Sequence, residues 1–325
     1  MKYQELQSFY QEKKLKNPDF EQTVSIIKSI ELAMNQPLED FSVKTLDDAI
    51  SIFYETGKTD VEFFICIMRY MRMIKHHELF IRLTQYTGGI DVIESILERL
   101  VTLHGEALKN KIINQLTLPQ LGMKPEKIIF FTSAFMTTLH QFFSPEEIKT
   151  ILTGNNHQIP ISSFESDKVL YESSETLEEF LRLKHQNMIE ILSKHAKENK
   201  VWFEQHITED VVRYIASDQE LLSARLIDDT LMMRKIPYNV EEYLKTKDPL
   251  QKRYLSCHCP FAREAILNPK ADISPLWCYC SAGFEKLPFE TVLNHPLKIR
   301  VLKSVLNGDE ECRFAISLKD IPYKK

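Results

Sequence analysis

The chain has 325 residues, of which 43% are hydrophobic and 27% are charged, a balance typical of folded globular proteins and unlike that of disordered chains. Its formal net charge of -5 disfavours binding to nucleic acid or to an anionic membrane surface. No hydrophobic run approaches the roughly 20 residues that a transmembrane helix needs, and the first residues lack the apolar core of a secretory signal. We therefore expect a cytoplasmic protein that binds neither nucleic acid nor membranes.

The length allows more than one compact unit, each with its own core. The 8 glycines form neither the G-x-G-x-x-G loop of dinucleotide-binding proteins nor the G-x-x-x-x-G-K-[ST] loop of nucleotide triphosphatases. The usual phosphate-binding loops are therefore absent from the sequence.

The first two thirds of the chain have the hydrophobic periodicity of amphipathic helices. Thr45 has the side chain of a helix N-cap, and Ser144 precedes Pro145 at what would be a first helical position. Gly57 is a typical helix stop. Helices are expected in segments with the approximate bounds 20–30, 45–57, 60–74, 90–116, 130–143, 145–153, 176–199 and 208–217.

After Leu226 the pattern changes to one that favours strands and turns. Asp228-Asp229 is a turn signal, and Asn307-Gly308 accepts the positive φ angles of a tight hairpin connection. Strands are expected at 230–237, 253–259, 297–306 and 312–318, with helices at 260–267 and 281–294.

These elements predict an α+β protein whose N-terminal two thirds are mostly helical and whose smaller C-terminal domain contains an antiparallel sheet. Pro119 and Gly122 interrupt the helical pattern, so we place a domain boundary near them. The predicted domains are residues 1–124, and residues 125–325 with the α+β part from about residue 226.

The chemistry-bearing residues are concentrated in the C-terminal region. Five of the six cysteines lie between Cys257 and Cys312, and four of them form the two C-x-C pairs Cys257/Cys259 and Cys278/Cys280. In extended backbone, residues two apart point to the same face, so each pair would present two thiols together. Four thiolates are the ligand set of a closed tetrahedral zinc site, and Cys312 could approach from the hairpin as a fifth ligand. Zinc is therefore the first candidate metal.

A reactive thiol is the second interpretation of the same residues. Cys259 and Cys280 each precede a predicted helix, whose N-terminal N–H groups would lower a thiol pKa. Arg263 could hold a substrate carboxylate, and His258 or Glu264 could carry a proton. Cys259, Cys280, His258, Arg263 and Glu264 are thus the candidate catalytic residues.

A third interpretation is that the cysteines are buried packing residues, since free cysteine is one of the most frequently buried residue types. Cys66, on the apolar face of a predicted helix, is interpreted in this way. Asn155-Asn156-His157 lies in a predicted loop, where polar side chains are common for turn reasons alone, and His157 would be an extra ligand only if that loop met the cysteines.

Cys259-Pro260-Phe261, a second cysteine at 278 or 280, and Gly308 to Phe314 resemble the C-terminal pattern of L-2-amino-thiazoline-4-carboxylate hydrolase-like proteins. Those proteins are in turn similar to small-ligand-binding domains of the 4-vinyl reductase type. The phrase from Lys235 to Gly283 resembles an uncharacterised bacterial family of cysteine-containing proteins. The resemblance implies an α+β domain for a small ligand or metal, with Cys259, Cys280 and Cys312 as matching positions. Where an acidic residue is expected after the second cysteine, this chain has Ser281.

The leading hypothesis is a cytoplasmic protein whose C-terminal cysteine cluster binds zinc or a small-molecule ligand, with a cysteine-dependent hydrolase of the thiazoline-carboxylate type as its enzymatic form. The rival hypothesis is a non-catalytic metal or redox sensor, or a helical module that binds a protein partner.

Overall fold

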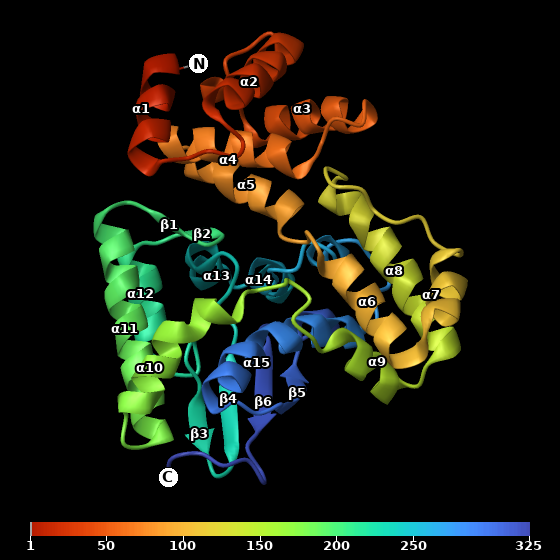
Figure 1. The fold of residues 1–325 in the computed structure, drawn as a ribbon, viewed down its shortest axis with the longest axis vertical. Coiled ribbons are helices and arrows are strands. Elements are labelled where there is room, and N and C mark those ends of the chain that lie inside the picture. Colours follow the sequence, from red (N-terminus) through yellow and green to blue (C-terminus); the bar gives the residue numbers. More distant parts are fainter. Residues whose placement is uncertain (1) are drawn as a thin grey trace. The chain divides into compact units, whose positions relative to one another are not determined.

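The computed structural model describes residues 2–325, which divide into two compact units (Figure 1). The first unit contains the residues up to Ile90 together with Pro119–Ile128, and the second contains Asp91–Leu118 and Ile129–Lys325. The predicted α+β class is confirmed, because the chain begins with helices and carries its antiparallel sheets in the C-terminal region. The division at residue 124 into independently folding domains stays a prediction.

The first unit is entirely helical. Its elements are α1 (Tyr3–Lys13), α2 (Phe20–Met34), η1 (Leu38–Asp40), α3 (Val43–Glu55), α4 (Val61–Ile74) and α5 (His77–Thr87). Their apolar faces form one core, within which Cys66 of α4 is fully buried and accepts a hydrogen bond from Thr23 Oγ1. The prediction that Cys66 is buried is therefore confirmed.

Capping side chains set where these helices begin. Asp19, Ser42 and Asp60 each accept a hydrogen bond from the backbone N–H three residues later, which satisfies a donor that the helix leaves free. Helix α3 starts at Val43 rather than at Thr45, because Ser42 is its cap.

The second unit carries the remaining helices and all the strands. Its helices are α6 (Val92–His104), α7 (Glu106–Ile113), α8 (Pro125–Phe142, which begins in the first unit), α9 (Pro145–Leu152), α10 (Glu165–Ser173), α11 (Leu177–Lys197), α12 (Glu209–Ala216), α13 (Val240–Lys245), α14 (Pro249–Ser256) and α15 (Tyr279–Leu293), with short 3-10 turns η2 (Ile161–Phe164), η3 (Arg263–Ile266), η4 (Pro275–Cys278) and η5 (Val305–Asn307). The single helix predicted at 90–116 is wrong. Gly105 adopts a φ of 85° and separates α6 from α7, since a residue with this φ cannot continue a right-handed helix.

The main sheet has four antiparallel strands in the order β3-β4-β6-β5. These are β3 (Arg225–Ile227), β4 (Thr230–Arg234), β5 (Lys298–Lys303) and β6 (Arg313–Ser317), and a separate short hairpin joins β1 (Val201–Trp202) to β2 (Gln205–His206). In the central pair, Leu231 lies opposite Ile316 and Arg234 opposite Arg313. The strand predicted at 230–237 is therefore confirmed in its first part.

One face of the sheet is covered by helices, α15 and α11 among them, as Figure 1 shows for α15. Leu231 and Met233 of β4 are buried while their neighbours are only half-buried, which is the alternation expected of a sheet with one covered face. Phe289 and Leu293 of α15 pack into the same core. This packing fixes the start of α15, and with it Cys280, relative to the strands.

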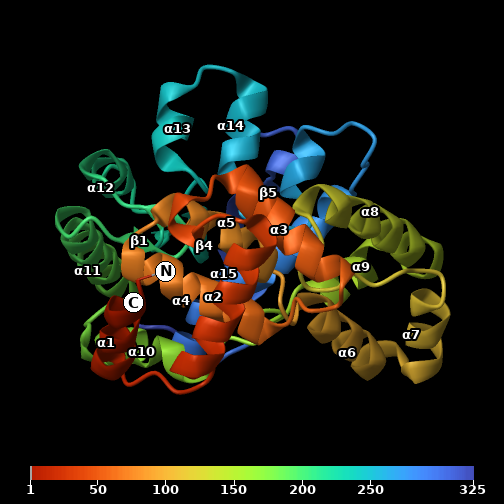
Figure 2. The same cartoon turned by 90° about the horizontal axis from the view of Figure 1, so that it is seen from above.

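The structure corrects three expectations around the cysteines. Residues 253–259 do not form a strand, because Asp248 caps and Pro249 begins helix α14, which pairs with α13 (Figure 2) and ends at Ser256. The helix predicted at 260–267 is only the 3-10 turn η3. The hairpin pairs β5 with β6 as expected, but its connection contains η5 and places Gly308 at a φ of 100° instead of forming a two-residue turn.

Phe314 of β6 is 1% exposed; it packs into the core under the sheet and also lines the cavity near the cysteines. Phe314→Ala should therefore lower the free energy of unfolding of the second unit by about 3–5 kcal/mol. Both tryptophans, Trp202 and Trp277, lie in this unit, so tryptophan fluorescence during urea unfolding follows it selectively. Leu302→Ala, on the same sheet but 41% exposed, is the control and should change the value by less than about 0.5 kcal/mol. Equal effects of the two substitutions would contradict the packing described.

Candidate functional site

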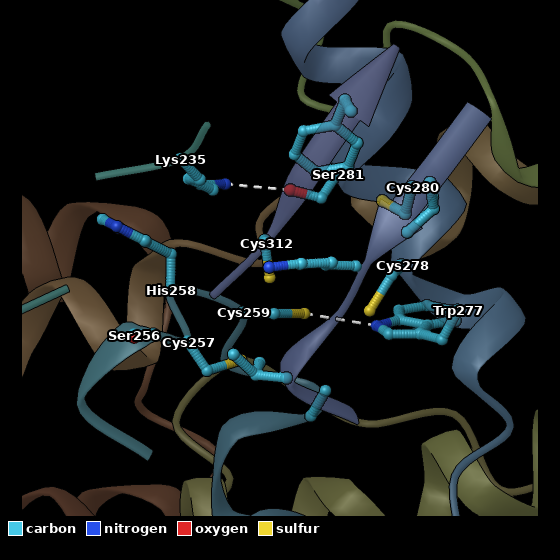
Figure 3. A pocket seen from close by; sticks show the side chains of 15 residues that line it. Lys235, Ser256, Cys257, His258, Cys259, Trp277, Cys278, Cys280, Ser281 and Cys312 are labelled. Carbon is cyan, nitrogen blue, oxygen red and sulfur yellow. Dashed lines mark hydrogen bonds between the residues drawn. The ribbon is translucent and has the colours of Figure 1, made fainter. Parts of the chain in front are cut away.

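Five cysteines surround one small cavity of about 30 Å³ in the second unit (Figure 3). They are Cys257, Cys259, Cys278, Cys280 and Cys312. The two C-x-C pairs thus meet, and the cysteine from the hairpin joins them. The cavity lies at the end of the sheet where β4 stops and β6 begins, and the Lys235 N–H donates to the Cys312 carbonyl oxygen (2.9 Å) directly beyond the last paired residues.

The first pair is held by the segment that follows α14. The Ser256 hydroxyl donates to the Glu310 carbonyl oxygen (2.9 Å), which ties this segment to the connection between β5 and β6. The Cys259 carbonyl oxygen accepts the N–H of Arg263 (2.9 Å) as the chain turns into η3. Two side chains that were expected to share one face of a strand therefore reach the cavity from a loop.

The second pair lies at a junction between two helical turns instead of in a strand. Pro275 begins η4, which ends at Cys278, and α15 starts at Tyr279. Cys280 is consequently in the first turn of α15 and is 5% exposed. The extended backbone predicted for the second pair is wrong, and the first pair is not in a strand although Cys257 itself is extended. All four side chains border the same space.

Three hydrogen-bonding groups face the sulfur atoms. The Trp277 indole N–H donates to Cys259 Sγ (3.2 Å), and the Asn156 amide donates to Cys280 Sγ (3.4 Å). The Ser304 hydroxyl lies 2.9 Å from Cys278 Sγ. Trp277 is 1% exposed and its indole is a donor only, so Cys259 must act as an acceptor.

Burial raises the pKa of every thiol in the cluster. For Cys280 the pKa rises from 9.0 to about 12. Neighbouring thiolates add repulsion: Cys257, Cys259 and Cys312 all raise the pKa of Cys278, whereas among the cysteines only Cys259 acts on Cys280. The low pKa expected from the helix N-terminus is therefore not found, because desolvation outweighs the dipole.

A lysine completes the lining of the cavity. Lys235 Nζ donates to Ser281 Oγ (2.9 Å) and lies 3.4 Å from a Glu285 carboxylate oxygen, as Figure 3 shows for Ser281. Its side chain is 19% exposed. Burial lowers the lysine pKa, but Glu285, Cys312 and neighbouring acidic groups raise it further, so the net shift is upward and the amine is charged.

His258 borders the cavity, but both of its ring nitrogens are occupied. Nδ1 lies 2.8 Å from a Glu204 carboxylate oxygen, and Nε2 lies 2.8 Å from the Ile236 carbonyl oxygen. The pKa of Glu204 is lowered, because its hydrogen bond and charge interaction with His258 and the nearby Lys235 outweigh desolvation. His258 therefore has no ring nitrogen left to meet the thiols in this arrangement.

Arg263 and Glu264 are placed away from the cavity lining. The Arg263 guanidinium lies over the rings of Tyr238 (4.3 Å) and Tyr254 (5.0 Å) and is 5% exposed. Glu264 accepts a hydrogen bond from the Tyr254 hydroxyl (2.9 Å) and lies 3.4 Å from Arg263. Their catalytic roles stay predictions, while the contacts observed are those of a buried cation held by aromatic rings and one carboxylate.

The sequence reasoning missed three residues at this site. Lys235 was placed inside the strand predicted at 230–237, whereas β4 ends at Arg234, so no sequence signal singled it out. Trp277 was given no role. Asn156 was attributed to a loop, yet it is 2% exposed and bonds to Cys280, while His157 next to it packs its ring against Phe284 (5.5 Å).

Within residues 2–325, no three histidine, cysteine, aspartate or glutamate side chains converge closely enough to form a ready metal site. No disulfide joins any cysteine of this part of the chain either, and all six thiols are free. The five cysteines thus line one cavity but do not have the spacing of metal ligands.

Residues 219–322 match a family of unknown function, DUF6144. The matched segment covers about a third of the chain and includes all five clustered cysteines and Lys235, but not Asn156. No curated protein and no solved structure matches the chain. No helix in the described residues is both long and apolar enough to cross a bilayer.

The raised thiol pKa values predict an alkaline loss of stability in chelator-treated protein. Below pH 9.0 the thiols are protonated in both the folded and the unfolded protein, so their raised pKa values cost no stability there. Above it the unfolded chain loses protons that Cys280 keeps until about pH 12, and the free energy of unfolding should fall by up to about 1.4 kcal/mol per pH unit for each buried thiol.

Urea unfolding followed by tryptophan fluorescence between pH 8 and 11 measures this slope. Cys280→Ala should make it shallower. Cys66→Ala, in the first unit, is the control and should leave it unchanged. A slope that does not depend on Cys280 would show that its thiol is not buried as described.

Proposed function

We propose that the C-terminal region binds one zinc ion through the thiolates of Cys257, Cys259, Cys278 and Cys312. The observation that carries this proposal is the convergence of five cysteines on a single small cavity. Four thiolates satisfy the tetrahedral preference of zinc, and such all-sulfur sites are structural. The proposed role is therefore a metal-stabilised domain without a catalytic step.

The choice of four ligands follows from how the thiols affect one another. Cys257, Cys259 and Cys312 each raise the pKa of Cys278, and Cys259 and Cys312 also raise that of Cys257, which supports grouping these four as ligands. Cys280 interacts only with Cys259 among the cysteines, and its sulfur already accepts a hydrogen bond from Asn156. Cys280 is therefore the cysteine that the zinc site does not need.

Metal binding would stabilise the thiolate form, which burial and the neighbouring thiols disfavour in the metal-free protein. Four thiolates around a divalent cation leave a net charge of −2, which is costly to bury without compensation. The Lys235 ammonium beside Cys259 and Cys312 offsets part of that charge, and the Trp277 N–H supports the Cys259 thiolate. The sulfur atoms have to rotate about χ1 towards the cavity to reach zinc–sulfur distances of about 2.3 Å.

Cysteine-dependent hydrolysis, the enzymatic hypothesis from the thiazoline-carboxylate hydrolase resemblance, has less support. A nucleophilic cysteine must be a thiolate near neutral pH, whereas burial raises the pKa of all five thiols. Arg263 and Glu264 do not line the cavity, and both nitrogens of His258 are engaged. A metal-binding role needs none of these three residues.

Zinc titration of reduced, chelator-treated protein tests the proposal. About one zinc per chain should bind, and calorimetry in two buffers with different ionisation enthalpies should show release of about four protons, because the thiols are protonated beforehand. Cys278→Ser should weaken binding at least about 100-fold, since it removes a ligand. Cys280→Ser and Cys66→Ser should bind within about tenfold of the unmodified protein. Equal binding by all three variants, or none by the unmodified protein, would refute the assignment.

Lys235→Met tests the charge compensation separately. Replacing the ammonium by an uncharged side chain of similar length should reduce zinc affinity about 10–100-fold, as is usual when a group surrounding the ligands is lost. Lys252→Met is the matched control, because Lys252 pairs with Glu310 (3.0 Å) and does not line the cavity. If both lysine variants bind zinc equally well, Lys235 has no part in the site.

A further inference from the structure

A second and larger cavity, of about 550 Å³, opens beside the cysteine cluster within the same unit. It is formed by one side of α6 and by the loop that follows α9. Most of its lining side chains are polar: Ser95, Glu98, Arg99, Thr102, Leu103, Asn155, Asn156 and Gln158. It lies outside the segment that matches the family of unknown function. Its size and polarity suit a small charged molecule.

Arg99 is the charged group that the surrounding protein does not neutralise. Among residues 2–325 no carboxylate lies within ion-pair distance of its guanidinium and no hydrogen bond engages it, whereas the half-buried Arg234 and Arg313 each pair with a carboxylate. A guanidinium presents a planar fork of donors that matches carboxylate and phosphate oxygens. Arg99 is thus a half-buried cation at a cavity with its donors free.

Two glycines allow close packing next to Arg99. A Cβ on Gly154 would lie 2.3 Å from an Arg99 guanidinium nitrogen, and a Cβ on Gly283 would lie 2.4 Å from the Gly154 carbonyl oxygen. Neither glycine has a positive φ, so the close contact explains them and a strained backbone does not. The guanidinium, the loop and helix α15 are therefore stacked in direct contact.

The other polar groups of the cavity are partly committed to the loop itself. The Asn155 side chain bonds to the backbone of Ile159, and Gln158 donates to Ser95 Oγ (3.1 Å). The Ser95 hydroxyl keeps its own hydrogen for a ligand acceptor. Glu98 also borders the cavity and can accept a hydrogen bond from a hydroxyl or ammonium group of the ligand.

Asn156 connects this cavity to the cysteine cluster. It lines the cavity, is 2% exposed, and donates from one amide nitrogen to the Leu152 carbonyl oxygen (2.7 Å) and to Cys280 Sγ (3.4 Å). Asn156 therefore contacts both this cavity and Cys280, the cysteine that the proposed zinc site does not need.

We propose that this cavity binds a small molecule through a carboxylate or phosphate group held by Arg99 and Ser95, and that the occupied cavity shields Cys280 from reagents. The ligand lies over Asn156 and holds the loop against α15, so solvent reaches the Cys280 sulfur less often. The proposal does not rest on zinc binding.

Calorimetric titration with malonate and, separately, with inorganic phosphate tests the site and distinguishes the two anion sources. Saturable binding of at least one anion is expected. Arg99→Gln should weaken it about tenfold or more, while Arg182→Gln, which removes an exposed arginine of α11, should leave it unchanged. Arg99→Lys keeps the charge but loses the planar pair of donors, so its anion affinity should lie between those of the unmodified protein and Arg99→Gln. This variant covers the case in which Arg99→Gln does not fold.

The second readout is the rate at which iodoacetamide modifies Cys280, followed by peptide mass spectrometry. The bound anion should slow this rate in the unmodified protein and not in Arg99→Gln. The proposal is overturned if neither anion binds, if Arg99→Gln and Arg182→Gln bind it equally well, or if the bound anion leaves Cys280 equally reactive. These readouts use no metal, so a failed zinc titration would leave them unaffected.

Discussion

The gathering of five cysteines around one cavity, two of them buried and three half-buried, is the constraint on which the rest of this region depends. Each thiol loses its hydration there, and each thiolate would repel its neighbours, so burial raises the pKa of all five. The loop after α14, the junction between η4 and α15, and the segment before β6 bring these five side chains to one cavity.

Part of this arrangement could be predicted from the sequence. The clustering of cysteines after residue 256 located the site, and the periodicity of residues 230–237 and 312–318 gave two strands whose ends border it. These predictions succeeded because strand patterning and capping are local properties. Both C-x-C pairs line the same cavity, as predicted, but the extended backbone given as the reason does not hold for Cys278 and Cys280, which lie in helical turns.

Other features depend on tertiary contacts that no local pattern encodes. Cys280 lies in the first turn of α15, a position that favours a low thiol pKa, but burial raises the pKa instead. Asn156 is more than a hundred residues from the cysteine to which it donates, and Lys235 reaches the cavity only because β4 pairs with β6. The glycines at 154 and 283 likewise make sense only once their segments are in contact.

Zinc-edge X-ray absorption on protein purified without chelators tests the central claim most directly, because it identifies the metal and its nearest atoms together. The account predicts about one zinc per chain, surrounded by four sulfur atoms at about 2.3 Å with no nitrogen or oxygen neighbour. A protein that carries no zinc, and takes none up when all six thiols are reduced, would contradict it. A shell dominated by nitrogen or oxygen would contradict it equally.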